Sequence, residues 1–108
     1  MLGFAPFPMH YLLFYDYVAD YIERRVPLRA AHVAHARAAL ARGEFVLGGA
    51  MSDPPAGVLL FRGDSPAAAE AFAAADPYVV NGLVTHWRVR EWVTVVGKDA
   101  EAPLPPGV

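Results

Sequence analysis

The 108-residue sequence contains no cysteine, and this absence removes several kinds of chemistry from consideration. Without thiols the chain forms no disulfide, carries no thiolate nucleophile and offers no cysteine ligand to zinc. A cysteine-free chain suits a reducing compartment, so we expect a cytoplasmic protein.

Concentrated positive charge and long hydrophobic runs are also missing. The nine Lys and Arg residues are scattered, and the formal net charge is −2. Nucleic-acid-binding domains display a basic patch or stripe, so we expect no nucleic-acid partner. Residues 1–8 have neither the basic start nor the length of a signal peptide or a spanning helix, so we expect no membrane partner.

Apolar residues are abundant instead, at 56% of the chain, against about 45–50% in ordinary soluble domains. A chain of this length builds one hydrophobic core, and the excess apolar surface favours a partner chain, here a homodimer. We expect a flexible arm at residues 1–8, a single domain at residues 9–96 and a flexible proline-rich tail at residues 97–108.

Hydrophobic patterns and turn residues predict six elements in the order β-α-β-β-α-β. Pro27 suits the first position of a helix, and Gly43 is typical of the residue that follows one. Asp64 or Ser65 is expected to cap a second, alanine-rich helix, and Pro77 forces the preceding Asp76 out of the helical region. The strands are expected at residues 9–18, 45–51, 58–62 and 83–96, and the helices at residues 27–42 and 65–75.

This order is that of the ferredoxin-like split unit, an α+β fold. Its antiparallel sheet has the strand order 4-1-3-2 and carries both helices on one face. Along the last strand, Trp87 and Val89 share one face, whereas His86, Arg88 and Trp92 share the other. The face without helices presents aromatic residues among charges, a composition suited to a subunit interface.

In this topology one end of the domain gathers polar residues that lie far apart in the sequence. The start of the first helix brings Arg29 and His32, three residues apart and therefore on one surface. The end of the second helix brings Asp76 and Tyr78, and the start of the last strand brings His86. We interpret His32 and Asp76 as candidate catalytic residues, and Arg29, Tyr78 and His86 as candidate substrate-binding residues.

Each of these residues also has an ordinary structural interpretation. His32 is either a general base or acid, or a core histidine satisfied by one hydrogen bond. Asp76 either orients His32 as a carboxylate partner or only ends a helix before proline. Arg29 either holds a substrate carboxylate or pairs with Asp76 or Glu23.

Metal and cofactor motifs are absent from the sequence. His35 follows His32 at a spacing compatible with a shared metal, but no carboxylate follows at helical spacing and no HExxH pattern exists, so we expect no native metal site. Gly48-Gly49 lies inside a strand and opens no helix, so it is not a phosphate loop. We therefore expect no cofactor.

Several of these residues together resemble the YCII-related (YciI-like) family. The resemblance rests on Arg29-x-x-His32, on a strand that ends in glycine at Gly49, on Ala75-Asp76-Pro77-Tyr78 after an alanine-rich helix, and on His86. It covers residues 9–96, and the Asp-Pro-Tyr motif is its most specific part. The chain departs from the family at Ala50, where proline commonly follows the glycine, so the edge of the pocket is expected to differ.

The resemblance implies a dimeric α+β barrel, in which two ferredoxin-like sheets pack face to face. It also implies that His32 and Asp76 act as a catalytic pair on a small molecule, since one relative removes chloride from a chlorinated aromatic compound. Without a serine or cysteine nucleophile motif, proton transfer is favoured over acyl transfer. The predicted function is thus a cofactor-independent enzyme for a small organic molecule, with a non-catalytic ligand-binding dimer and a purely structural dimer as alternatives.

Overall fold

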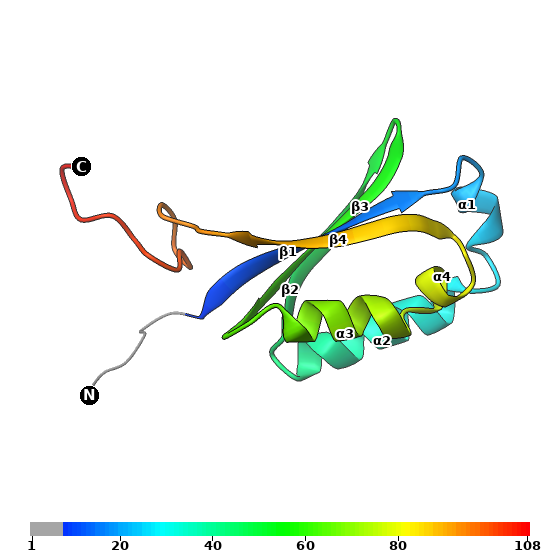
Figure 1. Cartoon of the computed structure of the whole chain (residues 1–108), viewed down its shortest axis with the longest axis horizontal. Coiled ribbons are helices and arrows are strands. Elements are labelled where there is room, and N and C mark those ends of the chain that lie inside the picture. The colour runs from blue at the N-terminus through cyan, green and yellow to red at the C-terminus, as the bar shows by residue number, and fades with distance from the viewer. Residues whose placement is uncertain (1–7) are drawn as a thin grey trace.

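The structure is a computed structural model that describes residues 8–108. Residues 1–7 of the predicted N-terminal arm lie outside the described residues. One antiparallel sheet carries helices on a single face, and Figure 1 shows α2 and α3 side by side beneath it. The elements are β1 (Met9–Tyr17), α1 (Tyr21–Arg24), α2 (Arg29–Ala41), β2 (Phe45–Ser52), β3 (Pro55–Gly63), α3 (Ala67–Ala75), α4 (Pro77–Val80) and β4 (Val84–Trp92).

The sheet has the order β2-β3-β1-β4, which confirms the predicted order 4-1-3-2 read from the opposite edge. β1 is central and pairs antiparallel with both β3 and β4. In this register Leu13 lies opposite Leu59 on one side and Val89 on the other. The α+β fold with a ferredoxin-like sheet is therefore confirmed.

The helices begin later than their proline signals predicted. α2 starts at Arg29, with Leu28 as its N-cap, so Pro27 belongs to the preceding turn and not to the first helical position. α3 starts at Ala67, with Pro66 as its N-cap. Ser65 still accepts a hydrogen bond from the Ala67 backbone N–H at 3.2 Å, which is the role expected of a capping side chain.

The core lies between the helices and the face of the sheet that they cover. Along β1 the buried residues alternate with less buried ones, as expected for a strand with two different faces. Tyr11, Leu13 and Tyr15 point toward the helices, and α3 contributes Phe72. The small alanines of α3 bring this helix close to the sheet, with Ala69 and Ala73 buried beside Phe72.

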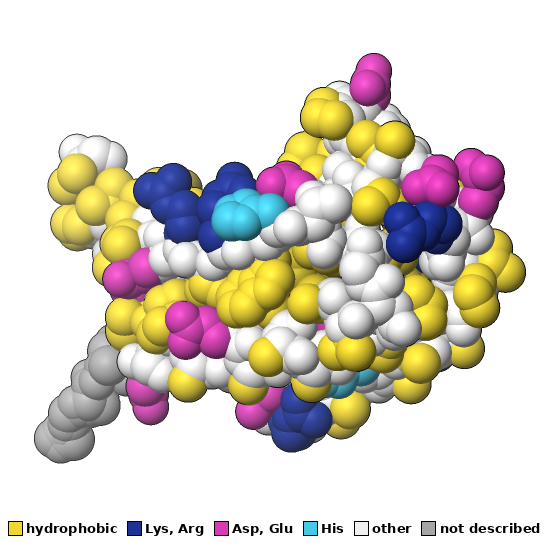
Figure 2. All heavy atoms as spheres, turned by 45° about the vertical axis from the view of Figure 1, so that its right-hand side comes forward, with side chains coloured by type: hydrophobic (Ala, Val, Ile, Leu, Met, Phe, Trp, Pro, Cys, Tyr) yellow, Lys and Arg dark blue, Asp and Glu magenta, His cyan; other side chains and the backbone are white. Residues whose placement is uncertain are grey.

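The other face of the sheet carries no helix among the described residues, as Figure 1 shows. It includes a shallow apolar groove of about 500 Å³, and it leaves Leu47 and Trp92 exposed by 69% and 48%. Figure 2 shows how much of the surface seen from one side is hydrophobic. The groove is lined by Leu12, Leu47, Gly48, Gly49, Val58, Leu60 and Trp92.

The predicted flexible tail makes several contacts beyond the end of β4. The backbone N–H groups of Ala102 and Leu104 donate to the carbonyls of Thr94 and Val95, both at 2.9 Å. The Thr94 hydroxyl also accepts from the Glu101 N–H at 2.7 Å. The first part of the tail therefore folds back along the chain that follows β4.

No helix in residues 8–108 is long and apolar enough to cross a membrane.

Candidate functional site

The site is built around Asp76, which lies at the junction of α3 and α4. Pro77 begins α4, and a residue before proline is kept out of the α region, so Asp76 has extended φ and ψ of −66° and 125°. This conformation ends α3 and makes Asp76 the N-cap of α4. Its carboxylate accepts a hydrogen bond from the Tyr78 backbone N–H at 3.0 Å. The predicted helix-ending role of Asp76 is therefore confirmed.

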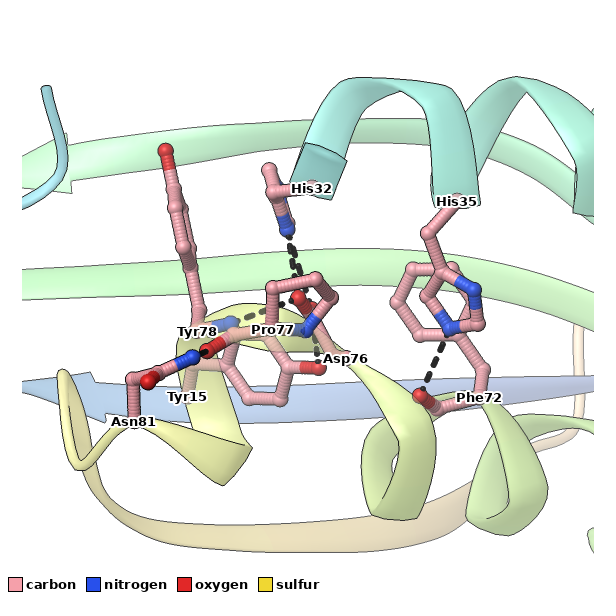
Figure 3. A network of polar contacts seen from close by, with 8 residues as sticks. All are labelled: Tyr15, His32, His35, Phe72, Asp76, Pro77, Tyr78 and Asn81. Atoms are coloured by element: carbon pink, nitrogen blue, oxygen red, sulfur yellow. Dashed lines mark hydrogen bonds and ion pairs between the residues drawn. The ribbon is translucent and has the colours of Figure 1, made fainter. Parts of the chain in front are cut away.

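Two further donors converge on the same carboxylate from different elements (Figure 3). From β1, the Tyr15 hydroxyl donates at 2.7 Å. From α2, the Nδ1 atom of His32 lies 2.8 Å and 3.0 Å from the two carboxylate oxygens. Asp76 is 0% exposed, so these contacts replace the water that a buried carboxylate has lost.

These contacts determine which nitrogen of His32 carries the proton. A carboxylate only accepts hydrogen bonds, so the ring nitrogen that faces it must be the donor, Nδ1–H. In the neutral imidazole the other nitrogen, Nε2, then bears the lone pair. The His32 side chain is 16% exposed and lines a pocket, so Nε2 is the atom available to a bound molecule.

Tyr15 supports this arrangement as a neutral donor. Its pKa is raised far above the ordinary value by burial first, then by the negative charge of Asp76 and by the hydrogen bond to it. The hydroxyl therefore keeps its proton throughout the physiological range and always donates to Asp76. The carboxylate is held from two sides, which fixes its orientation toward His32.

Tyr78 fixes the plane of the imidazole. Its ring stacks on the ring of His32 with centroids 3.7 Å apart and planes inclined by 5°. A second stacked pair, Tyr17 and Tyr21, has a centroid distance of 4.2 Å, and Tyr17 meets the edge of Tyr78. The aromatic rings thus form rigid walls beside Nε2.

The pocket next to His32 has a volume of about 300 Å³. It lies between α1, α2 and α4 on one side and β2 on the other. Gly48, Gly49 and Ala50 of β2 line it, and their small size leaves the space opposite the aromatic walls open. Arg25 and Arg29 line the pocket as well.

The structure brings together four of the five predicted site residues. Arg29, His32 and Tyr78 line the pocket, and Asp76 lies buried behind His32. In the described part of the chain Arg29 forms no ion pair with Asp76 or Glu23, so that alternative for Arg29 is not observed.

His86 is the exception: we predicted it as a substrate-binding residue, and it does not line this pocket. It is exposed, and in β4 it alternates with Trp87, which packs against the core. Its partner across the sheet is Asp16, on the face away from the helices. The position of His86 along β4 was correct, but the alternation of the strand turns its side chain to the opposite face.

His35 also has a structural task. Its Nε2 atom lies 3.0 Å from the Phe72 carbonyl, and its ring stacks on Phe72 at 4.2 Å. Because a carbonyl only accepts, Nε2 is a donor and has no lone pair for a metal. Residues 8–108 contain no group of three or more His, Cys, Asp or Glu residues placed to hold a metal ion.

Sequence reasoning missed the residues that complete the pocket. Tyr15 had a usable signal, since it shares the buried face of β1 with Tyr11 and Leu13. Tyr21 and Arg25 lie in and after the short helix α1, in a segment outside those to which we assigned site residues. No pattern in that segment indicates which way its side chains point.

One protein of known structure and two proteins of similar sequence resemble this chain over most of its length. The 5-chloro-2-hydroxyhydroquinone dehydrochlorinase TftG from Burkholderia phenoliruptrix AC1100, solved in complex with 2,5-dihydroxybenzoquinone, is similar in fold, with a TM-score of 0.67 and 21% identity. The similarity covers 80% of this chain and 95% of that one.

Curated relatives are closer in sequence. Protein YciI from Escherichia coli O6:H1 and Protein YciI from Shigella flexneri are each 31% identical over 97 residues, which is 81% of this chain and 99% of theirs. The model of the YCII-related domain matches residues 9–93. With a match across nearly the whole folded domain, the chain belongs to the YCII-related family.

Proposed function

We propose that this protein is a cofactor-independent enzyme that moves a proton on a small organic molecule, with His32 as the base and Asp76 as the residue that orients it. The proposal rests on one observation, the different roles of the two ring nitrogens of His32. Nδ1 is occupied by the buried Asp76, and Nε2 remains available to the pocket that His32 lines. A base with one nitrogen anchored and the other free has the arrangement needed for general base catalysis.

The reaction class that suits this site is proton abstraction from a carbon next to a carbonyl. His32 Nε2 takes the proton, and the electron pair left behind moves onto the carbonyl oxygen to give an enolate. Return of the proton from Nε2 to the same or a conjugated atom regenerates the neutral imidazole, so the cycle needs no oxidant or reductant. The similarity in fold to a dehydrochlorinase of a hydroxylated aromatic compound supports small-molecule chemistry.

The second candidate function is binding without catalysis. The same pocket, the same aromatic walls and the same arginines would hold a ligand whether or not His32 takes a proton. The pair of His32 and Asp76 would then serve only to keep the pocket rigid. A measurement of proton transfer separates the two functions, whereas a measurement of affinity alone does not.

We further infer that the protein works as a homodimer in the cytoplasm. The open face of the sheet exposes large apolar residues, including Leu47 and Trp92, and exposed apolar patches commonly mark sites of protein association. Gly48 and Gly49 line both the groove on this face and the pocket beside His32. A second chain seated on the open face would therefore lie against the rim of the site.

The test is exchange of hydrogen for deuterium in a panel of small ketones, keto acids and phenols, followed by NMR in D₂O. The wild-type protein should accelerate exchange at a carbon next to a carbonyl or hydroxyl in at least one compound. His32→Gln should lose about 10²–10⁴-fold of this rate, the usual contribution of a general base. Arg37→Gln is the control, because it alters an exposed side chain of the same helix outside the pocket, and it should keep the full rate.

Two outcomes would contradict the catalytic proposal. A compound that binds in the pocket without any accelerated exchange would favour the binding function. Equal rates in wild type and His32→Gln would show that another group transfers the proton.

A further inference from the structure

The hydroxyl of Tyr78 is a buried polar group that the protein leaves unused. Tyr78 is 2% exposed, and its Oη is the buried side-chain oxygen or nitrogen atom in residues 8–108 that has no hydrogen-bond partner. The rest of the residue is held firmly, by the stack on His32 and by the backbone bond to Asp76. An unpaired buried hydroxyl costs free energy, so a rigid residue that keeps one calls for a partner absent from the chain.

Figure 3 shows where this hydroxyl points: it lies at the end of the ring farthest from Asp76, beside the imidazole of His32. Tyr78 lines the same pocket as His32. The hydroxyl and the free Nε2 atom of His32 therefore belong to one cavity.

Two arginines lie beside this hydroxyl. Burial raises the pKa of Tyr78, while the positive charges of Arg29 and Arg25 and a side-chain interaction of Arg29 with the hydroxyl act in the opposite direction. A guanidinium only donates, so the Tyr78 O–H itself still has no acceptor among the described residues. Both arginines line the pocket, but neither forms an ion pair with a carboxylate in the described part of the chain. The guanidinium of Arg25 lies over the Tyr21 ring, 5.5 Å from its centroid, which holds it at the pocket wall.

Among residues 8–108, the lining of the pocket offers no negative charge to balance these arginines. Its lining includes no Asp or Glu, and Asp76 is turned away into its bonds with Tyr15, His32 and the Tyr78 N–H. A positively charged cavity with an unpaired hydroxyl donor favours an anionic oxygen, since both features stabilise negative charge.

The walls add a requirement of shape. The stacked rings of Tyr17 and Tyr21, and of His32 and Tyr78, present flat aromatic surfaces. On the opposite side a Cβ added to Gly49 would meet nothing within 4 Å, whereas one added to Gly48 would lie 2.8 Å from the Phe45 ring. Space of about 300 Å³ between flat walls admits a molecule of single-ring size.

We propose that the pocket binds a small planar conjugated anion, with its charged oxygen on the Tyr78 hydroxyl between Arg25 and Arg29. This inference rests on the function proposed above and names the substrate class for it. The charged oxygen is a carboxylate or phenolate in the bound molecule. His32 then removes a proton from a carbon next to a carbonyl group of the same molecule, and the electron pair moves onto that carbonyl oxygen to give an enolate. The original anionic oxygen stays on the Tyr78 O–H and between the two guanidinium groups, and its charge does not change in the step. Arg25 and Tyr78 thereby select the substrate, and His32 acts on it.

The test uses benzoate as a planar anion and benzamide as a neutral molecule of the same size and shape. Affinities are measured by NMR titration and calorimetry at pH 7. Benzoate should bind at least about tenfold more tightly than benzamide. Tyr78→Phe and Arg25→Gln should each weaken benzoate binding several-fold and leave benzamide unchanged. Arg37→Gln, on the exposed side of the same helix as His32, is the matched control and should change neither affinity.

A stability measurement shows whether weaker binding by Tyr78→Phe results only from unfolding of the variant. Because the Tyr78 O–H has no acceptor in residues 8–108, Tyr78→Phe should unfold at the same denaturant concentration as wild type or a higher one. If Tyr78→Phe is less stable than wild type, the inference is overturned, because the hydroxyl then stabilises the folded protein. Equal binding of benzoate and benzamide, or benzoate binding indifferent to Arg25 and Tyr78, would overturn it as well.

The failure of this inference and the failure of the proposed function give different results. His32→Gln should still prefer benzoate over benzamide, because the anion rests on Tyr78 and the arginines. If that preference holds while no compound shows accelerated deuterium exchange, the anion site stands and the catalytic role falls. If exchange is observed without any preference for anions, the catalytic role stands and the anion site is wrong.

Discussion

At the scale of single residues, the site depends on the buried carboxylate of Asp76, which accepts hydrogen bonds from several donors at once. Asp76 accepts from Tyr15, from His32 and from the Tyr78 backbone, so each of its partners is also positioned by it. Removal of one donor leaves a buried acceptor short of a hydrogen bond, which typically costs about 1–3 kcal/mol. Stability and site geometry are therefore linked at this carboxylate.

The raised pKa of Tyr15 predicts a loss of stability at alkaline pH. In the unfolded chain Tyr15 releases its proton near pH 10, but burial and the charge of Asp76 keep the proton on the folded chain well above that pH. The contribution of Tyr15 is fully present below about pH 10, and above it the free energy of unfolding falls by about 1.4 kcal/mol per pH unit. In Tyr15→Phe this part of the slope should vanish. Urea denaturation between pH 9 and 11 measures it, and identical slopes in both proteins would contradict the assignment.

At the scale of elements, α3 depends on one large side chain. Its other buried residues are alanines, and Phe72 packs between Phe45 and Phe61 of the sheet and the His35 ring of α2. Phe72 is thus the contact that joins both helices to the sheet.

Phe72→Ala should lower the free energy of unfolding by about 3–5 kcal/mol, because the small neighbours on α3 cannot fill the cavity. The measurement is a chemical-denaturation curve. Leu40→Ala, on the exposed part of α2, serves as the control and should cost far less, since Leu40 is half exposed. A midpoint for Phe72→Ala close to that of wild type would mean that α3 is anchored in another way.

The sequence predicted the four strands, the two longer helices and their order, because each depends on local patterns. The one-turn helices α1 and α4 were not among the six predicted elements. Alternation along β1, proline and glycine signals and the alanine-rich helix all act over a few residues. Once the topology was assigned, the approach of His32 to Asp76, 44 residues apart, followed from it.

The parts that sequence reasoning missed depend on orientation. β4 carries aromatic and aliphatic residues on both faces, so alternation alone did not reveal that Trp87 faces the core and His86 faces away. Tyr21 and Arg25 approach the pocket only because of how the chain turns between β1 and α2. The His10 backbone N–H of β1 donates to the Glu101 carboxylate at 3.2 Å, and this contact joins a proline-rich tail to the sheet without any periodic pattern to indicate it.

At the scale of the whole molecule, the uncovered face of the sheet predicts a homodimer at micromolar concentration. A groove of about 500 Å³ and the exposed Leu47 and Trp92 lie on this face. Trp92→Glu should give a monomer, because a charge would have to be buried in the interface. Leu40→Glu places the same charge at an exposed apolar position on the helical side and should leave the dimer intact. Sedimentation velocity distinguishes these outcomes, and a wild-type monomer would contradict the prediction.

The central claim is that Asp76 fixes His32 with its proton on Nδ1 and its lone pair on Nε2. Two-bond ¹H–¹⁵N correlation spectra of neutral His32 report this tautomer directly. We expect wild type to show the Nδ1–H form, and Asp76→Asn to show a shift toward the Nε2–H form, because the charged acceptor is gone. Wild-type protein with the proton on Nε2 would contradict the account, since no lone pair would then face the pocket.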